Sequence, residues 1–368
     1  MDNFIKKLKS ANLPRLIIFG FFLLIVALMG VYRLDVLSFI GSVIKYWGMW
    51  GILVLAMIPS IQCGVGPNFG VSLGIVCGIL SGLLAIEFDI ATRVNAYLPG
   101  LGPWFAFFFA VAVGAVIAWF IGVAYGMLLN KVKGDEMTVT TYIGYSAIYL
   151  MSIVWFTAPF TSGIIKWTIG GKGVRNQINL NTSFANVLND ACGFTIFKKD
   201  GVTAGIYIPT GLILFVLFMC FLVFIYMKTK TGKAITAAGS NPQFARASGI
   251  NVDKMRIKGI ALSTALGAIG IIVYAQSYGF VQAYTAPLSM GFQCVAAVLI
   301  GGATTRKAKI SHVIIGTFLF QGLIILTPPL SNVMLQGTDI SDTMRQIIQN
   351  GVILYALTKV KGGVSGEE

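Results

Sequence analysis

The sequence predicts an all-α polytopic membrane protein with about ten transmembrane helices. Hydrophobic residues make up 56% of the 368 residues and charged residues only 11%, whereas an ordinary soluble domain has about 25% charged residues. Apolar runs of about 20 residues, long enough to cross the hydrocarbon core of a bilayer, recur along the whole chain. Lys and Arg gather in short clusters between these runs, a pattern typical of loops on the cytoplasmic side.

The charge balance and the cysteines exclude several classes of partner. The net charge of +14 does not indicate nucleic acid, because the basic residues follow the pattern of membrane-protein loops. The five cysteines lie mostly within apolar runs and show no C-x-x-C pairing, so they support neither a metal site nor a disulfide framework. We therefore expect membrane lipid around the chain, no nucleic-acid partner, no metal and no cofactor.

Hydropathy defines the expected spans one by one. The first run follows a basic stretch, as in a signal peptide, but it lacks a clean cleavage site and Arg33 and Asp35 follow it directly, so we interpret it as an uncleaved span. The second and the last spans are the weakest, since Lys45 lies near the start of one and the other is short with a polar front. The expected spans are 15–32, 44–62, 69–88, 103–129, 142–160, 206–228, 258–278, 288–303, 311–329 and 346–358.

The basic clusters fix the expected orientation. With an even number of spans all five clusters fall on one side, which must be the cytoplasm, so both termini are expected there. Residues 229–257 then form a cytoplasmic loop, and residues 161–205 form a long extracytoplasmic loop in which 178–189 predict a short surface helix or strand. No separate soluble domain is expected, and residues 1–368 form one transmembrane domain. The clusters are Lys6 to Arg15, Lys131 and Lys133, Lys228 to Lys258, Arg306 to Lys309, and Lys359 and Lys361.

The chain lacks the groups that an intramembrane enzyme needs. Its one histidine, His312, lies at the start of a span, where a structural role is the usual one, and no span centre carries an acid or a base. Such groups are the usual marks of proton-coupled pathways. Gly232-Lys233 does not form a phosphate-binding loop, because Met227 and Ala234 replace the Gly and the Ser or Thr that the motif requires. We expect no catalytic residue and no ATP hydrolysis by this chain.

Two polar segments interrupt the apolar spans. "IPSIQCGVGPNFGVSLG" begins at residue 58 and "YAQSYGFVQAYTAPLSMGFQC" at residue 274. Irregular backbone at membrane depth is tolerated where it is buried in protein or lines a watery cavity, and one broken helix in each half typically indicates a transport site between two related halves. Hydrogen bonds that pack helices together are the alternative. The predicted pathway residues are Gln62, Asn68, Phe69, Ser72, Gln276, Tyr278, Gln282 and Gln293.

The cytoplasmic loop has an unusual polar stretch, "AAGSNPQFARASGINVDK", over residues 237–254. A helix with Ala, Ser and Gly on one face can approach another protein closely, and Asn-Pro and Ser-Gly are typical stops. Arg246, Lys254 and Arg256 would then pair with carboxylates at the rim of that contact. The stretch therefore predicts a docking helix.

This stretch resembles the corresponding loop in the permease subunits of bacterial ABC importers for ribose and other simple sugars, nucleosides and branched-chain amino acids. "AAVLIGGAT" at 296–304 is also similar to the segment near the end of that family's eighth span, whereas the following "TTRKAKISHV" replaces a stretch that is commonly glycine-rich in the family. The resemblance implies that the loop couples to an ATPase subunit. The coupling residues that it implies are Gly239, Asn241, Ala245, Arg246, Ala247, Ser248, Gly249 and Ile250.

The resemblance also implies a set of partners: cytoplasmic ATPase subunits, a second permease subunit, and an extracytoplasmic solute-binding protein or lipoprotein. The long outer loop and the divergent motifs favour a heterodimer of permeases over a homodimer. The expected function is passage of a small polar solute, a simple sugar or a nucleoside, across a bacterial inner membrane. A stand-alone secondary transporter or channel for a small neutral solute is the alternative, and an intramembrane transferase is a third reading.

Overall fold

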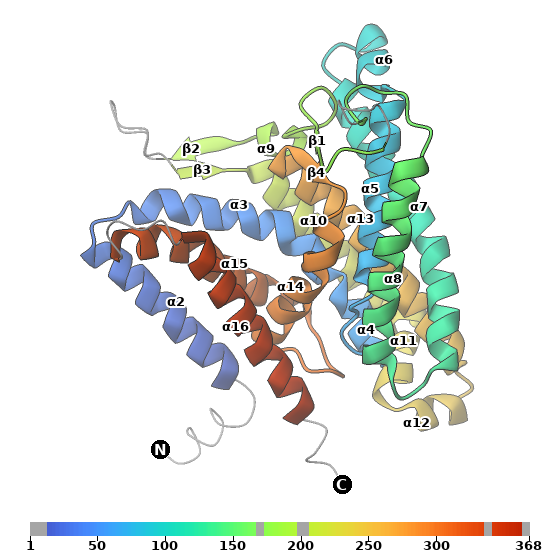
Figure 1. Ribbon diagram of the computed structural model, residues 1–368. Coiled ribbons are helices and arrows are strands. Elements are labelled where there is room, and N and C mark those ends of the chain that lie inside the picture. The colour runs from blue at the N-terminus through green and yellow to red at the C-terminus, as the bar shows by residue number, and fades with distance from the viewer. Residues whose placement is uncertain (1–12, 167–172, 197–205, 335–340, 363–368) are drawn as a thin grey trace.

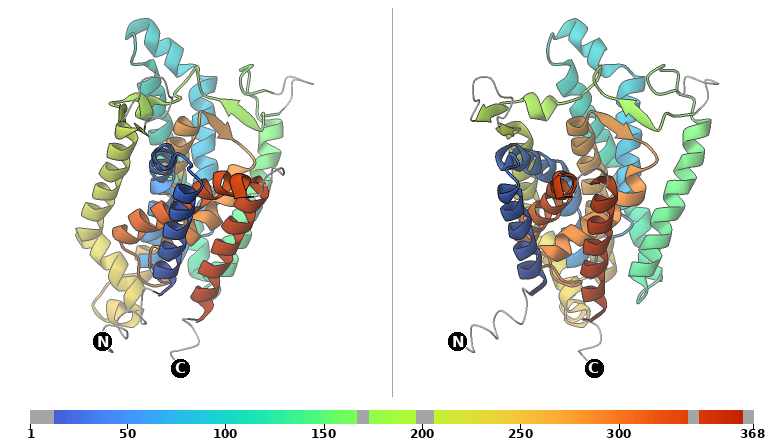
Figure 2. Two further views of the ribbon diagram at one scale, coloured as in Figure 1. Left: turned by 90° about the vertical axis from the view of Figure 1, so that its left-hand side faces the viewer. Right: turned by 60° about the vertical axis from the view of Figure 1, so that its left-hand side comes forward.

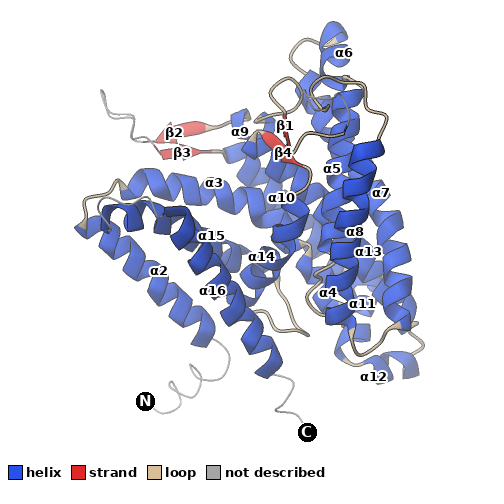
Figure 3. Cartoon of the chain, viewed as in Figure 1, coloured by secondary structure: helices blue, strands red, loops and turns tan. Residues whose placement is uncertain are grey.

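The computed structural model describes residues 13–166, 173–196, 206–334 and 341–362. Over this part of the chain the fold is mostly helical, as Figure 1 and Figure 3 show. The helices are α2 (Leu13–Val31), α3 (Val36–Leu55), α4 (Met57–Gln62), α5 (Val71–Glu87), α6 (Ile90–Tyr97), α7 (Gly102–Lys131), α8 (Glu136–Thr157), α9 (Val187–Asp190), α10 (Thr210–Lys228), α11 (Lys230–Ser240), α12 (Pro242–Ala247), α13 (Val252–Tyr278), α14 (Ala286–Ile300), α15 (Ile310–Met334) and α16 (Ser341–Gly362).

Two small antiparallel sheets of three-residue strands accompany the helices. β1 (Gln177–Asn179) pairs with β4 (Phe280–Gln282), and β2 (Phe194–Ile196) pairs with β3 (Ile206–Ile208). β1 and α9 confirm the short elements predicted within 178–189. β3 also corrects the sixth expected span, whose helix begins only at Thr210, because the residues just before it pair as a strand with the preceding segment.

Six helical segments in the described chain are long and apolar enough to cross a membrane, and the number rises to seven if α5 and α6 count as one bent span. α3 and α4 together form one of these segments. α5 and α6 meet at 49°, with Asp89 between them in the left-handed region at φ 47°. Expected spans 15–32 and 288–303 correspond to the shorter apolar helices Arg15–Val31 and α14, and 346–358 lies within α16.

Side-chain caps place helix boundaries that hydropathy does not. The Asn241 side chain accepts a hydrogen bond from the backbone N–H of Phe244 and starts α12, and the Asn251 side chain does the same for Lys254 and α13, as good N-caps do. α13 therefore starts at Val252 rather than at 258. The predicted loop 229–257 is itself largely helical.

α13 forms the centre of the molecule and packs against α3, α5 and α7. Glycines bring these helices close together, as small residues do between membrane helices. A Cβ at Gly74 of α5 would lie 2.2 Å from the carbonyl oxygen of Thr264 on α13. A Cβ at Gly122 of α7 would lie 2.8 Å from the Cα of Ala261 on the same helix. The centre of the fold is thus held by direct contact between backbones.

The outer helices expose their apolar side chains. Phe120 on α7, Phe156 on α8 and Leu214 on α10 are all more than half exposed. Exposed apolar surface of this extent is typical of a site that another apolar phase covers. Together with the candidate spans, it describes a multi-pass membrane protein with lipid on these faces.

The elements divide between two ends of the molecule. α6, α9 and the strands lie at one end, whereas α11, α12, the start of α2 and the end of α16 lie at the other (Figure 1 and Figure 2). α3 runs across the direction of α7 and α13 rather than along it (Figure 1). We call the two ends the strand end and the α12 end.

Candidate functional site

The first polar segment forms a buried break between α4 and α5, over residues 63–70. Gly64 and Gly66 adopt positive φ angles of 82° and 91°, which side chains other than glycine rarely adopt. Because the surrounding helices bury the segment, its irregular backbone is protected from lipid. Irregular backbone thus occurs where the first polar segment predicts it, between the candidate span formed by α3 and α4 and the helix α5.

Asn68 lies at the centre of this break and is completely buried. Its Nδ2 donates to the Ser263 hydroxyl at 3.0 Å, and its Oδ1 accepts from the Tyr125 hydroxyl at 3.0 Å. Both ends of the amide are thus engaged in tying the segment to α13 and α7. This geometry is that of a packing bond between helices, and contact between Asn68 and solute stays a prediction.

Three predicted pathway residues lie where the two polar segments meet. The Ser72 hydroxyl donates to the carbonyl oxygen of Pro287 at 2.8 Å, and the Phe69 and Phe292 rings lie 5.2 Å apart. Gln293 is buried on α14 directly after Phe292. A cleft opens here between α5, α8 and α14, lined by Phe69, Ser72, Thr141, Gly144, Tyr145, Ile148, Leu288, Gly291 and Phe292.

Gln62 lies apart from that cleft, on the side of α11. Its Nε2 donates to the carbonyl oxygen of Ala308 at 2.8 Å, and its Oε1 accepts from the Thr236 hydroxyl at 3.2 Å. It therefore joins the end of α4 to α11 and to the segment before α15. The structure does not bring Gln62 together with Ser72 and Gln293.

Gln276 holds α9 against the strand end of α13 by hydrogen bonds. The fully buried side chain accepts from the Leu188 backbone N–H at 3.2 Å and donates to the Ser277 hydroxyl, which donates to Asn189 Oδ1 at 2.8 Å. The Tyr207 hydroxyl donates to the Asn189 carbonyl oxygen at 2.7 Å. Burial, and then the charge of the nearby Asp190 carboxylate, raise the pKa of Tyr207, so the phenol remains a donor.

Tyr278 and Gln282 lie beyond Gln276 along the chain. The Tyr278 ring stacks on Tyr274 with centroids 5.5 Å apart and remains 38% exposed. Gln282 is half-buried in β4, where its partner in register is Gln177 of β1. The predicted pathway residues thus fall into separate groups along the molecule rather than around one cavity.

The polar stretch 237–254 lies at the α12 end, where it includes the end of α11 and the whole of α12. Gly239 faces inward rather than outward, since a Cβ there would lie 2.2 Å from the carbonyl oxygen of Gln62 and 2.5 Å from the backbone N of Gly64. α11 is therefore packed directly on the end of α4 and the start of the break between α4 and α5.

Ala245 is also on the inner side, which corrects the expected docking face. It is fully buried and packs with Ala238 and Val252, because the N-cap at Asn241 turns α12 back onto α11 and α13. Phe244 is 68% exposed instead. Sequence reasoning missed Phe244, although a large aromatic residue in a stretch of small ones is a signal that could have found it.

The outward face of this helix keeps several of the expected residues. Asn241, Arg246, Ala247, Ser248 and Gly249 are all exposed, and Ile250 is partly exposed. Gly249 has a φ of 78° and open space around it, which ends the helix in a left-handed turn. The exposed residues Phe244, Arg246, Ala247, Ser248 and Gly249, which we call the α12 face, are the surface that α12 offers to a partner.

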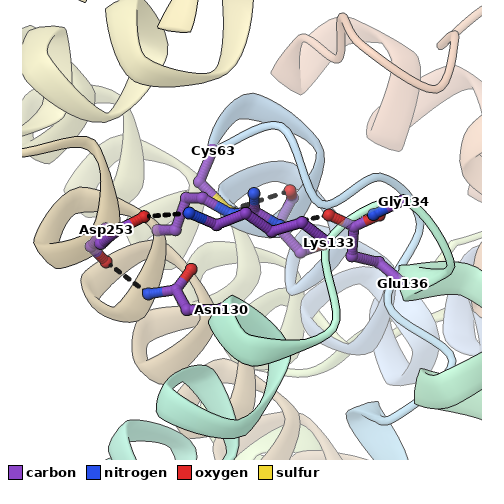
Figure 4. Close-up of polar contacts among 8 residues, drawn as sticks. Cys63, Asn130, Lys133, Gly134, Glu136 and Asp253 are labelled. Atoms are coloured by element: carbon purple, nitrogen blue, oxygen red, sulfur yellow. Dashed lines mark hydrogen bonds and ion pairs between the residues drawn. The ribbon is translucent and has the colours of Figure 1, made fainter. Parts of the chain in front are cut away.

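A polar cluster ties the start of α13 to the turn between α7 and α8 (Figure 4). Lys133 forms an ion pair with Asp253 at 2.7 Å, and Asn130 Nδ2 donates to the backbone carbonyl of Asp253 at 2.9 Å. The Glu136 carboxylate accepts from the backbone N–H of Gly134 at 3.0 Å. The turn is thus fixed to the helix that continues from α12.

Arg256 also belongs to this cluster and corrects a second expectation. It forms an ion pair with Glu136 at 2.5 Å, and the two side chains are only 11% and 15% exposed. It is therefore a buried bond within the chain and not a rim contact for a partner. Arg246 remains exposed and available to one.

No group of three or more His, Cys, Asp or Glu residues that could hold a metal ion occurs among the residues described. The polar groups above are amides, hydroxyls and ion pairs with partners inside the protein. Such an arrangement can position helices and contact a neutral solute.

Comparison with known proteins places these features in a family. Residues 38–357 match the family described as branched-chain amino acid transport system, permease component. The nucleoside ABC transporter permease protein NupB of Lactococcus lactis is 22% identical over 244 residues, which are 60% of this chain and 63% of that protein. The chain thus covers somewhat less than two thirds of this relative.

Two other relatives cover more of the chain. The nucleoside ABC transporter permease protein NupC of Lactococcus lactis is 24% identical over 280 residues, 72% of this chain and 79% of that protein. The xylose transport system permease protein XylH of Haemophilus influenzae is 24% identical over 346 residues, 86% of this chain and 87% of that protein. No solved structure shows a significant match.

Proposed function

Because the chain belongs to the branched-chain amino acid transport system permease family, we propose that it is the permease subunit of an ABC importer for a small polar solute. A simple sugar or a nucleoside is the proposed solute, since the relatives are named for nucleosides and for xylose. ATP hydrolysis belongs to a separate subunit, and this chain supplies the translocation pathway.

The observation that supports this proposal is the way α11 and α12 are built into the fold. α12 offers its exposed face at the α12 end, while Gly239 and Ala245 are packed inward against residues 62–64 and α13. A subunit that binds the α12 face therefore contacts a helix that packs on α11, and α11 in turn packs on the backbone at residues 62–64. Packed contacts of this kind can carry coupling between an ATPase and a membrane pathway.

The proposed topology follows from the same end of the molecule. The start of α2 and the end of α16 lie at the α12 end (Figure 2), so a cytoplasmic α12 places both termini in the cytoplasm of a bacterial inner membrane. Ten spans, two related halves and a single permease domain over 1–368 are retained as proposals. The segment 161–205 is then extracytoplasmic, where a solute-binding protein or lipoprotein delivers the solute, and a second, different permease completes the pathway.

Docking is tested by co-purification of the ATPase subunit with variants of the α12 face at equal membrane abundance. Ala247→Trp adds bulk to an exposed position and is expected to overpack a close interface at a cost of about 1–3 kcal/mol, which lowers association roughly ten- to a hundredfold. Phe244→Ala is expected to weaken it similarly by removing an exposed aromatic anchor. Arg246→Glu, at a solvated rim, changes association by at most about 1 kcal/mol.

Retention of the ATPase by both Ala247→Trp and Phe244→Ala would refute docking at α12. A second arm separates an importer from a stand-alone carrier. Inactivation of the partner ATPase by substitution of its phosphate-binding lysine is expected to abolish uptake through the intact permease. Uptake that continues without ATP hydrolysis would support the secondary transporter or channel instead.

A further inference from the structure

Three aromatic rings, those of Trp50 on α3 and of Tyr274 and Tyr278 on α13, lie in a row that runs inward from the strand end. We call this row the aromatic ladder. Tyr278 stacks on Tyr274 with centroids 5.5 Å apart and ring planes 20° apart, and Tyr274 meets Trp50 edge-on at 5.5 Å. Tyr274 and Tyr278 are four residues apart on α13, so they share one face of that helix. The exposed fraction falls along the ladder from 38% at Tyr278 to 7% at Tyr274 and 5% at Trp50.

The crossing of the two helices makes room for these rings. One turn before Tyr274, a Cβ at Gly270 would lie 2.8 Å from the backbone N of Leu53. α3 and α13 thus touch backbone to backbone at this point, and α3 crosses α13 rather than running along it (Figure 1). Tyr274 lies one turn further along α13, on the side of this close contact that faces the strand end.

Two polar groups in the ladder lack partners. Among the described residues, neither the Trp50 indole N–H nor the Tyr274 hydroxyl has a hydrogen-bond partner. Both side chains are more than nine-tenths buried, but neither polar atom is itself fully enclosed by protein. Buried Tyr and Trp usually find one. In this chain Trp47 Nε1 donates to the Ile314 carbonyl oxygen and the Tyr125 hydroxyl donates to Asn68. A ligand with a flat face and acceptor oxygens would stack on these rings and accept hydrogen bonds from the two free donors.

We propose that Trp50, Tyr274 and Tyr278 form a solute-binding site of this permease, in which the rings stack on a flat neutral solute and the two free donors bind its oxygens. This inference rests on the proposed importer function and adds the residues that select the solute. The shared chemistry is a flat face bearing hydroxyl or carbonyl oxygens, which both a nucleoside and a pentose ring present. Stacking of an aromatic ring on a nucleobase contributes about 1–3 kcal/mol.

The site is tested by uptake in cells that produce the complete importer and lack their own nucleoside and pentose uptake. Tritiated uridine and radiolabelled xylose are supplied separately, each well below the concentration that half-saturates wild-type uptake, so that a loss of affinity lowers the measured rate. The variants Tyr274→Phe and Trp50→Phe keep a ring and remove only the donor, so each is expected to lower uptake of the transported solute about tenfold, the loss of one buried hydrogen bond. Trp47→Phe is the matched control and is expected to leave uptake within about twofold of wild type. The Trp47 N–H already donates to the Ile314 carbonyl oxygen on α15, so it is not available to a solute.

A readout of stability separates solute binding from packing. Both variants are expected to keep wild-type membrane abundance, melting temperature and co-purification of the ATPase. Preferential loss of uridine uptake in Tyr278→Leu identifies stacking on a nucleobase, and preferential loss of xylose uptake identifies a sugar. Unchanged uptake in both donor variants, loss of uptake that parallels a fall in melting temperature, or import of neither probe by the wild type would each overturn this inference. ATPase co-purification reports on the importer function independently of these outcomes.

Discussion

Single glycines decide how closely the cytoplasmic elements approach the membrane helices. Gly239 lies in α11 against the backbone at residues 62–64, with its nearest neighbours the carbonyl oxygen of Gln62 and the backbone N of Gly64. These atoms belong to the main chain and have no rotamer to adopt. A methyl group at this position can be accommodated only if α11 moves away from residues 62–64. Such a movement would weaken the contact between α11 and the proposed translocation pathway.

Gly239→Ala is therefore expected to lower the stability of the protein by about 1–3 kcal/mol, the usual cost of overpacking, and to reduce uptake. Gly20→Ala is the matched control, because Gly20 is also helical but has open space around it, and replacement of a helical Gly by Ala typically stabilises by about 0.5–1 kcal/mol. Thermal unfolding of the detergent-purified protein measures both. Equal melting temperatures for the two variants would contradict the contact.

At the scale of elements, α13 links every functional feature of the molecule. It begins beside α12, carries Ser263 against the buried Asn68, and ends in the aromatic ladder. Its first turns are fixed to the turn between α7 and α8 by two ion pairs of different character. Arg256 and Glu136 are largely buried, whereas Lys133 and Asp253 are 41% and 53% exposed.

Removal of one partner from each ion pair is expected to lower the stability of the protein by unequal amounts. Glu136→Gln leaves the buried Arg256 charge without its counter-ion and is expected to cost about 3–5 kcal/mol. Lys133→Gln breaks a solvated pair and is expected to cost less than about 1 kcal/mol. The melting temperatures of the two variants check the difference, and the double variant Glu136→Gln, Arg256→Met is expected to recover part of the loss. A larger effect from Lys133→Gln would show that the burial of these pairs has been misjudged.

At the scale of the whole molecule, the two ends provide natural reporters of orientation. Cys192 is the exposed cysteine, and the other four cysteines, all within the described chain, are buried. Cys192 lies between α9 and β2 at the strand end, and Arg246 lies on the exposed face of α12 at the opposite end. The proposed topology places the first outside the cell and the second in the cytoplasm.

A membrane-impermeant maleimide is expected to label wild-type protein at Cys192 in intact spheroplasts. In a Cys192→Ser background, Arg246→Cys is expected to become labelled only after permeabilisation. Mass spectrometry of the labelled peptide identifies the site, and Cys192→Ser alone serves as the unlabelled control. Labelling of Arg246→Cys from outside would reverse the topology.

The sequence by itself determined that this protein is a multi-pass membrane protein and that it is mostly helical. These features are local, because the transfer of a span of about 20 residues from water to lipid depends only on its own side chains. The break at residues 63–70 was equally readable, since Pro and Gly within an apolar run interrupt a helix wherever it packs.

Only the tertiary structure decided which side of each element faces the protein. Asn68 bonds to Ser263, 195 positions along the chain, and Arg256 bonds to Glu136, 120 positions away, so neither partner could be chosen from local pattern. Ala245 and Phe244 are neighbours, yet one is buried and the other 68% exposed, because the cap at Asn241 sets the rotation of α12. Pairings of this kind depend on how helices cross, and the crossing is fixed by the sum of contacts along whole helices rather than by any one segment of sequence.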